Sequence, residues 1–220
     1  MQFVFSSVRH EVGNPLNTIM VTAQTLRSLL LREERDRLGQ YVDWILDEGH
    51  RIERLLRALK TFSLFEQVDA RPGDLVPFLE ALVQRILPVV STRGIHLHWS
   101  SEPATAPLVF DPEAVNHLVE NLVFNAVEAI EAEGGSRIEL LLRQPRNAGL
   151  QLVVRDDGPG IAPEHLDDVF KPFFSMKRGG SGLGLSLVQR IALAHGWTVR
   201  AERNPEKGVS FHVELRAEST

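Results

Sequence analysis

The sequence has 220 residues, of which 43% are apolar and 24% are charged, so it holds enough apolar material for one or two folded domains. Its 24 Lys and Arg against 29 Asp and Glu give a net charge of -5 without a long run of one sign, which excludes binding to nucleic acid or a membrane surface through charge alone. The lack of cysteine excludes disulfides, Cys-ligated zinc and thiol catalysis, and fits a reducing compartment.

Two long amphipathic helices are predicted at the N-terminal end. Apolar residues recur in steps of three and four over residues 5–30 and again over residues 38–62, with a polar break at residues 32–37. A single hairpin cannot bury apolar stripes of this length, but two copies can do so in a four-helix bundle. The sequence therefore predicts a helical hairpin that forms a homodimer.

A short polar segment at residues 69–74 separates this hairpin from the rest of the chain. It contains Pro72 and Gly73 and interrupts the helical period, which is typical of a domain boundary. We therefore expect a hairpin domain at residues 1–68, a linker at residues 69–74 and a second domain at residues 75–220.

The second domain mixes helices with strands. Asp111 is a good N-cap, Pro112 suits the first helical position, and Gly134 ends the helix that they begin. Apolar runs typical of strands occur on both sides of this helix. The pattern predicts an α+β sandwich with helices at residues 75–90, 112–133 and 183–195 and strands at residues 95–99, 137–143, 150–155, 197–202 and 209–215.

Two asparagines share one face of the helix at residues 112–133. Asn121 and Asn125 are four residues apart, and His117 lies one turn earlier. An isolated pair of this kind can simply cap neighbouring backbone or face solvent. Its meaning therefore depends on the segments that follow.

A carboxylate stands at the end of the apolar strand at residues 150–155. Asp156 begins the turn Asp156-Asp157-Gly158-Pro159-Gly160, where a buried carboxylate could accept a hydrogen bond from an exocyclic amine. The same residue types also favour an ordinary turn. Only the neighbouring motifs favour the first interpretation.

A glycine-rich segment at residues 179–186 opens the helix that follows it. Its N–H groups and the positive helix N-terminus suit a phosphate, and Lys177 just upstream adds a positive charge for a polyphosphate. The P-loop pattern G-x-x-x-x-G-K-[ST] is missing, and the glycines follow a polar loop rather than a strand. The sequence therefore predicts a nucleotide site that is neither a P-loop nor a Rossmann site.

His10 and Asn14 lie one turn apart on the first predicted helix, and Glu11 is next to His10. Because Pro15 cannot donate to the carbonyl of Glu11, we expect a bend that exposes His10. His10 and Glu11 begin the zinc motif H-E-x-x-H, but Asn14 replaces its second His, which excludes a zinc protease site. A lone helical His can also be a solvated side chain.

In this order the segments resemble the transmitter core of a two-component sensor histidine kinase, most closely the nitrogen-regulation type. Together the boxes that carry the resemblance are highly specific, and they cover nearly all of the chain. They are the phosphoacceptor box at residues 10–16, the N box at 121–126, the first glycine box at 156–161, the phenylalanine box at 170–177 and the second glycine box at 180–185.

The resemblance implies a dimerisation and histidine-phosphotransfer hairpin followed by a Bergerat-type ATP-binding sandwich. In that fold Asn125 would be the Mg²⁺ ligand, with Asn121 in support. Asp156 would bind the adenine amino group, and Gly158 and Gly160 would let the base approach.

The resemblance further implies a phosphate site beneath a lid at residues 162–179, with Phe173 and Phe174 as lid anchors that have no chemical role. The residues that would hold the phosphates are Lys177, Gly180, Gly182 and Gly184.

The implied activity is autophosphorylation of His10, followed by transfer to an aspartate of a response regulator receiver domain. Phosphoryl transfer needs in-line positioning and charge neutralisation, which Mg²⁺, Lys177 and glycine N–H groups can supply. A neutral imidazole, with a reference pKa of about 6.5, is available near neutral pH, and Glu11 can take the ring proton or orient the ring. Asn14 would orient a water for dephosphorylation of the partner, so phosphatase activity is a further hypothesis.

Two rival functions stay open beside this one. The first is a Bergerat-fold ATPase of the chaperone or DNA-repair type that drives dimer closure, and the hairpin with His10 argues against it. The second is a catalytically inactive dimeric scaffold, against which Asn125 and Asp156 argue. The chain departs from the family pattern at Gly13, where a basic or polar residue is usual, and at Trp197, where a second glycine is common.

We expect the chain to lie in the cytoplasm without membrane contact. No stretch approaches 18 uninterrupted apolar residues, and residues 1–7 lack the basic flank of a signal peptide. Only nine residues precede His10, so we expect any sensor or membrane anchor to belong to a longer protein.

Overall fold

The computed structural model of the chain describes residues 2–31, 38–65, 67–145, 149–177 and 180–216. The chain forms two compact units, Met1–Ser63 with Pro172–Leu183, and Leu64–Lys171 with Gly184–Thr220. None of the helices in the described ranges combines the length and the apolarity that crossing a bilayer requires.

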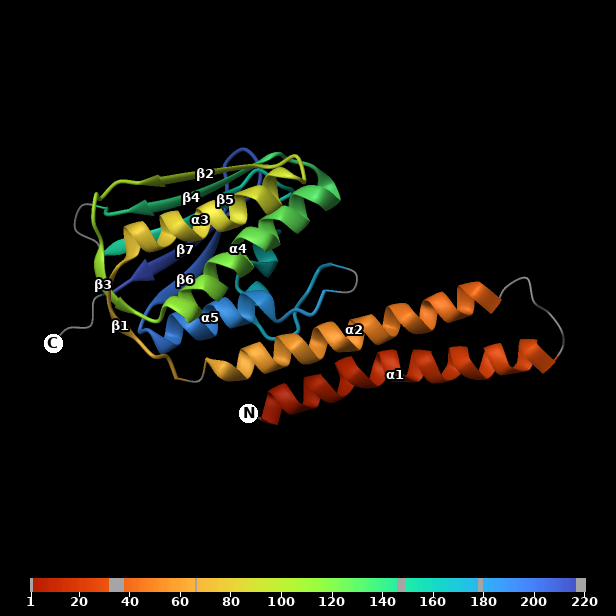
Figure 1. Cartoon of the computed structure of the whole chain (residues 1–220). Helices are drawn as coiled ribbons and strands as arrows, with labels where there is room; N and C mark the ends of the chain where they lie inside the picture. The colour runs from red at the N-terminus through yellow and green to blue at the C-terminus, as the bar shows by residue number, and fades with distance from the viewer. Residues whose placement is uncertain (1, 32–37, 66, 146–148, 178–179, 217–220) are drawn as a thin grey trace. The chain divides into compact units, whose positions relative to one another are not determined.

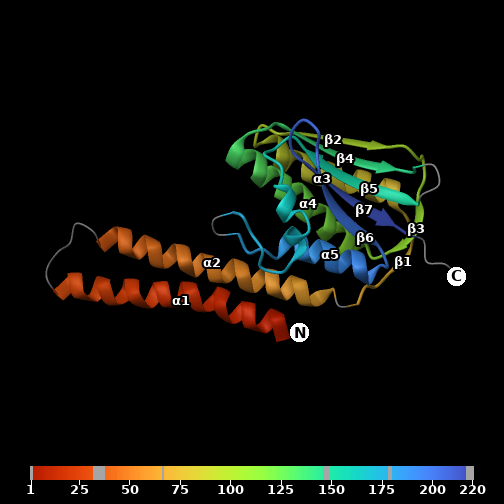
Figure 2. The same ribbon diagram turned by 180° about the vertical axis from the view of Figure 1, so that it is seen from behind.

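The first unit is built on two long helices, as the apolar stripes predict. α1 spans Gln2–Leu31 and α2 spans Leu38–Leu64, and Figure 1 and Figure 2 both show them side by side. Residues 32–37, the expected polar break, lie outside the described residues. Because α1 continues through Pro15, the proline does not end the helix, and the bend expected there stays a prediction.

The second unit is an α/β sandwich, as predicted. Its main sheet has five strands in the order β2-β4-β5-β7-β6, with β2 parallel to β4 and the other neighbours antiparallel. α3, α4 and α5 lie on one side of this sheet in both ribbon views (Figure 1, Figure 2). The helices are α3 (Leu75–Ser91), α4 (Pro112–Glu133) and α5 (Gly184–Ala194), and the strands are β2 (His96–Ser101), β4 (Arg137–Arg143), β5 (Leu150–Asp156), β6 (Thr198–Arg203) and β7 (Val209–Leu215).

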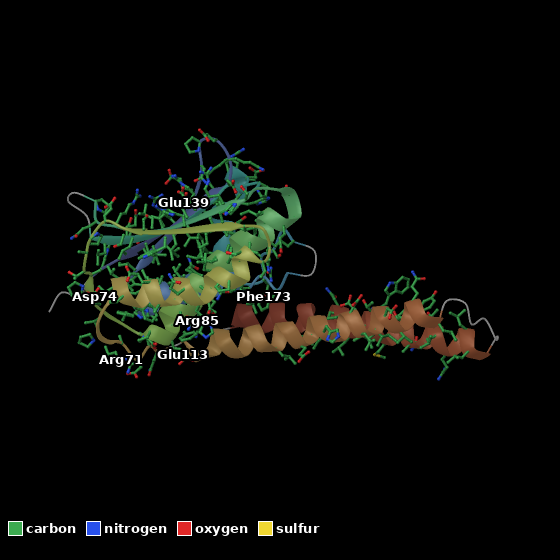
Figure 3. The ribbon with its side chains drawn as sticks, turned by 45° about the horizontal axis from the view of Figure 1, so that its top comes forward. Arg71, Asp74, Arg85, Glu113, Glu139 and Phe173 are labelled. Atoms are coloured by element: carbon green, nitrogen blue, oxygen red, sulfur yellow. The ribbon has the colours of Figure 1, made fainter. Side chains whose placement is uncertain are left out.

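Alternation along the strands sorts the side chains between the two faces of this sheet. Leu140 of β4, Val154 of β5 and Phe211 of β7 are cross-strand neighbours, and all three are buried. Because successive strand residues point to opposite faces, Glu139 and Arg155 lie on the other face. Figure 3 labels Glu139 above the sheet, on the side away from the helices. One face therefore forms the core with the helices, and the other face points away from them.

Part of the expected linker at residues 69–74 is a strand. β1 (Arg71–Asp74) pairs antiparallel with β3 (Pro107–Phe110) in a separate two-stranded sheet. Gly73 leaves room for the ring of Phe110, which would lie 3.0 Å from an added Cβ. Both strands have four residues, which is too short for alternation to be recognised in the sequence. The domain boundary itself stays a prediction.

The first part of the expected lid at residues 162–179 is not an open loop. It contains two turns of 3₁₀-helix, η1 (Pro163–His165) and η2 (Asp168–Phe170). The Phe170 ring is buried and packs edge-on against Phe211, with ring centroids 6.2 Å apart. This part of the segment is therefore anchored in the core of the second unit.

His212 is a buried titratable residue on the sheet face that points away from the helices. It pairs with Val153 of β5 and Arg200 of β6, and its side chain is 8% exposed. Its Nδ1 atom has no hydrogen-bond partner in the described part of the chain, and its Nε2 atom lies 3.5 Å from the Glu202 carboxylate. Burial, and after it the positive charge of Arg200, lowers the pKa of His212 to about 4, although Glu202 acts in the opposite direction.

We predict that His212→Gln flattens the pH dependence of stability below neutral pH. Because the folded-state pKa of His212 lies below the unfolded value of about 6.5, the unfolded chain binds more protons between these values, and stability falls as the pH falls through that window. Because of His212, the free energy of unfolding of the wild type should fall by about 2 kcal/mol from about pH 7 to about pH 5. His212→Gln should not show this part of the loss. Urea unfolding at both pH values measures it, and an equal loss in both proteins would contradict the prediction.

Candidate functional site

α4 presents the two asparagines beside its buried stripe. The helix begins where predicted, because Oδ1 of Asp111 accepts hydrogen bonds from the N–H groups of Glu113 and Ala114 at 2.9 and 3.1 Å. Asn121 and Asn125 are half-buried on one flank of the helix. Asn121 donates from Nδ2 to the carbonyl of the residue one turn earlier at 2.7 Å, which fixes its amide and turns Oδ1 away from that carbonyl.

The start of α5 lies against the amide of Asn121. A Cβ added to Gly184, the first residue of α5, would come within 2.9 Å of Asn121 Oδ1. A side chain at this position would therefore displace the amide. The glycine that the sequence assigns to phosphate binding therefore also leaves room for the Asn121 amide.

Asp156 is buried at the end of β5. Leu152, Val154 and Asp156 alternate along the strand on the face that the helices cover, and Asp156 is 3% exposed. Its Oδ1 atom accepts the N–H of Gly158 at 2.9 Å. The buried carboxylate is thus oriented by the turn that follows it, as the sequence predicts for a strand end that delivers a carboxylate into a turn.

The turn after β5 packs on the C-terminal half of α4. A Cβ added to Gly158 would lie 2.9 Å from Asp156 Oδ1 and 3.7 Å from the Cβ of Ala129. Asn121, Asn125 and Ala129 follow in steps of four, so one stripe of α4 runs about 12 Å from the start of α5 to the end of β5. Amide side chains and a helix N-terminus lie at one end of this stripe, and a carboxylate lies at the other.

Asp157 is a structural member of this turn that the sequence analysis did not single out. Its Oδ1 atom accepts the N–H groups of Ser136 and Arg137, both at 2.8 Å, and so ties the turn to the start of β4. Partial burial acts to raise the pKa of Asp157, but the hydrogen bonds from Arg137 and Ser136 outweigh it and lower that pKa. In the sequence, the only sign of this role is that a second Asp directly follows Asp156.

The rest of the expected phosphate site lies in the first unit. Lys177, Gly180 and Gly182 belong to the segment Pro172–Leu183, where the N–H of Gly180 donates to the carbonyl of Lys177 at 3.3 Å. Phe173 has a φ of 67° and donates its N–H to the carbonyl of Gly182 at 2.9 Å. Gly182 has a φ of 63° and no room for a Cβ beside the Phe173 backbone, so this position requires glycine. The hydrogen bond between Phe173 and Gly182 joins the two ends of this segment.

The expected phosphoacceptor residues lie on α1. His10 and Asn14 are one turn apart, and Asn14 is exposed. The side chains of His10 and Glu11 lie outside the described residues. The second unit therefore brings Asn121, Asn125, Asp156, Gly158 and Gly184 together along α4, with Gly160 in the same turn as Gly158, while His10, Glu11, Asn14, Lys177, Gly180 and Gly182 belong to the first unit.

The side chains on this flank of α4 suit a metal ion that is coordinated by both protein oxygens and the oxygens of a bound phosphate. In the ranges that the structure describes, no three His, Cys, Asp or Glu side chains gather as a metal site. Mg²⁺ is commonly held by one or two carboxylates together with substrate phosphates rather than by an all-protein cage. On the α4 stripe Asn125 would offer an amide oxygen in place of a carboxylate.

Two family models match the chain. Residues 1–67 match the His Kinase A (phospho-acceptor) domain. Residues 110–219 match the histidine kinase-, DNA gyrase B-, and HSP90-like ATPase.

Two of the relatives that match are named as sensor histidine kinases. The chain is 31% identical over 207 residues to the sensor histidine kinase ZraS of Klebsiella oxytoca, covering 94% of this chain and 44% of ZraS. It is also 31% identical to the sensory histidine kinase/phosphatase NtrB of Rhodobacter capsulatus, covering 94% of this chain and 59% of NtrB. The chain therefore spans about half the length of these curated relatives.

A solved structure shares the fold over both units. The histidine kinase ThkA in complex with response regulator protein TrrA superposes with a TM-score of 0.69, covering 96% of this chain and 60% of that chain at 22% identity. At this identity the likeness extends to the fold alone.

We predict that Gly184→Ala weakens nucleotide binding without destabilising the second unit. The added Cβ would displace Asn121 Oδ1, whereas alanine is the better helix former, so the affinity for Mg·AMPPNP should fall about tenfold while the melting temperature stays close to that of the wild type. Isothermal titration calorimetry measures the affinity. Gly39→Ala on α2, where a Cβ meets nothing within 4 Å, is the matched control. Wild-type affinity in Gly184→Ala would refute the prediction.

Proposed function

The chain belongs to the sensor histidine kinase family, and on this premise we propose that it binds ATP in its second unit and transfers the γ-phosphoryl group to His10. One observation carries the proposal: a phospho-acceptor domain that includes His10 and an ATPase domain occur in the same chain. An enzyme that only hydrolyses ATP has no use for a phospho-acceptor helix. The pairing of the two domains therefore favours phosphoryl transfer over the rival ATPase function.

We assign recognition of the adenine amino group to Asp156. Its burial supports this assignment, because a hydrogen bond between an amine and a carboxylate is stronger away from water. Gly158 and Gly160 would let the base approach the turn. A carboxylate has two oxygens with several acceptor sites, so it can accept the Gly158 N–H and a ligand amine together.

We assign the triphosphate to the opposite end of the α4 stripe. Asn125, supported by Asn121, would supply the protein ligand of Mg²⁺, which when bound neutralises phosphate charge. Lys177 would contribute a mobile positive charge, and backbone N–H groups would come from Gly180, Gly182 and Gly184. The close contact of Gly184 with the Asn121 amide supports a common role for these two motifs.

In the proposed reaction a ring nitrogen of His10 forms a bond to the γ-phosphorus. The bond from that phosphorus to the bridging oxygen breaks, and ADP leaves with the electron pair. The proton of the imidazole passes to Glu11, the adjacent carboxylate. We propose that the phosphoryl group then moves to an aspartate of a response regulator, which regenerates His10.

We also propose that the first unit pairs with a second copy in a four-helix bundle. Large apolar side chains of both helices are exposed in the single chain, and apolar surface of this extent is typical of an interaction site. The exposed residues are Leu16, Met20, Val21, Leu30, Val42, Trp44, Leu46 and Leu56.

Labelling with γ-labelled ATP and Mg²⁺ tests the proposed kinase activity. The wild type should acquire a label that is labile in acid and stable in alkali, because the phosphoryl group is attached to nitrogen. His10→Gln and Asn125→Ala should each abolish the label, since one removes the acceptor and the other removes the metal ligand.

Matched controls use the same substitutions elsewhere. His50→Gln changes an exposed histidine of α2, and Asn116→Ala changes an asparagine of α4 that contacts Arg85; both should label like the wild type. Unlabelled protein that steadily releases phosphate would establish the ATPase rival. Failure of the wild type to bind Mg·ATP would establish the scaffold.

Asn14→Ala should separate a phosphatase activity from the kinase activity. NtrB is named a kinase and phosphatase, and Asn14 is exposed one turn from His10, where its amide could orient a water. Dephosphorylation of a receiver domain that the chain has phosphorylated should slow by about tenfold or more, while labelling of His10 stays within about twofold of the wild type. Asn17→Ala, also exposed on α1, should change neither rate. An unchanged dephosphorylation rate in Asn14→Ala would remove the phosphatase hypothesis.

A further inference from the structure

A turn distant in sequence reaches back to the buried carboxylate. β6 and β7 are joined by a short turn that begins at Asn204 and ends at Gly208. The Asn204 side chain donates from Nδ2 to the backbone carbonyl of Asp156 at 2.8 Å, across 48 residues of sequence. This hydrogen bond acts on the residue to which we assign adenine recognition.

The Asn204 side chain is held at both ends. Nδ2 also donates to the carbonyl of Lys207 at 3.2 Å, and Oδ1 accepts the hydroxyl of Ser210 at 2.6 Å. Two carbonyl oxygens on one side and a hydroxyl donor on the other determine which end of the amide carries the nitrogen. An aspartate here would keep the acceptor for Ser210 and lose both donors.

The backbone of the same turn packs on the loop after β5. A side chain at Gly208, whose φ is 90°, would collide with the carbonyl oxygen of Asp156 and would lie 3.0 Å from its Oδ1 atom. The carbonyl oxygen of Gly208 lies 2.9 Å from where a Cβ of Gly160 would be. The turn therefore contacts both ends of the segment from Asp156 to Gly160.

The side chain of Asn204 differs from its neighbours in burial. Asn204 is half-buried and Gly208 is buried, whereas Pro205, Glu206 and Lys207 between them are exposed. An ordinary surface turn would not need an inward amide with partners on three residues. The burial thus marks Asn204 as the residue through which this turn acts on the site.

We propose that Asn204 is a positioning residue for adenine recognition: by holding the backbone at Asp156 it aims the carboxylate at the amino group of the base. The inference rests on the proposed role of Asp156 as the adenine-binding residue. A carboxylate moves with its backbone, and hydrogen bonds weaken steeply with misalignment. Loss of the Asn204 amide should therefore reduce the selectivity for adenine rather than nucleotide binding in general.

The test compares two nucleotides on the full chain. ATP carries the exocyclic amine, and purine riboside triphosphate lacks it but keeps the ring, the ribose and the phosphates. Dissociation constants for both, with Mg²⁺, are measured by calorimetry for the wild type, Asn204→Asp and Ser210→Ala. Glu206→Gln, an exposed residue of the same turn, is the matched control.

The wild type should prefer ATP, and Asn204→Asp should lose about tenfold in affinity for ATP while its affinity for purine riboside triphosphate changes by about twofold or less. The negative charge that this variant adds repels both triphosphates alike, so the ratio of the two affinities isolates the effect on the base. Ser210→Ala removes the hydroxyl that orients Asn204 and that also accepts a hydrogen bond from Arg155 Nε at 3.1 Å, and it should reduce the preference for ATP less than Asn204→Asp does. Glu206→Gln should keep the wild-type ratio.

Three outcomes would overturn the inference. A wild-type ratio in both Asn204→Asp and Ser210→Ala would show that the turn does not aim the carboxylate. Equal losses for both nucleotides would show a purely structural role. A wild type without preference for ATP would instead refute the role proposed for Asp156, and the inference about Asn204 would fall with it.

Discussion

Burial of a carboxylate at the end of β5 is the constraint on which the second unit depends. A buried charge is costly unless hydrogen bonds compensate for it, so Asp156 must be surrounded by groups that hold it. The N–H of Gly158 in the next turn donates to the carboxylate itself, and the amide of Asn204 between β6 and β7 donates to the backbone carbonyl of the same residue. The packing of the turn on α4 and on Gly208 keeps them in place.

The buried carboxylate at the end of β5 is also one end of the proposed nucleotide site. α4 spans the distance between the end of β5 and the start of α5, and its flank carries Asn121 and Asn125 between these points. In our proposal the end of β5 supplies the residue for the base, and α4 with the start of α5 supplies part of the phosphate site. In our proposal the second unit binds and orients ATP, while the first unit contributes His10 as the nucleophile.

Local signals in the sequence predicted much of this arrangement, and contacts distant in sequence account for what was missed. α4 has the predicted bounds because Asp111, Pro112 and Gly134 mark its ends within a few residues of chain. Asn204 was missed because a turn residue gives no sign of a partner 48 positions away. Likewise, Gly184 was read as a phosphate-binding residue, and only the packing of α5 on α4 adds its contact with the Asn121 amide.

The central claim is that the carboxylate of Asp156 selects the base, and the most direct measurement is the affinity of Asp156→Asn for Mg·ATP. This substitution preserves the shape of the side chain and removes its charge and one acceptor oxygen. We expect the affinity to fall by about ten- to a hundredfold while the melting curve shows a folded protein. A folded Asp156→Asn that binds Mg·ATP like the wild type would contradict the account.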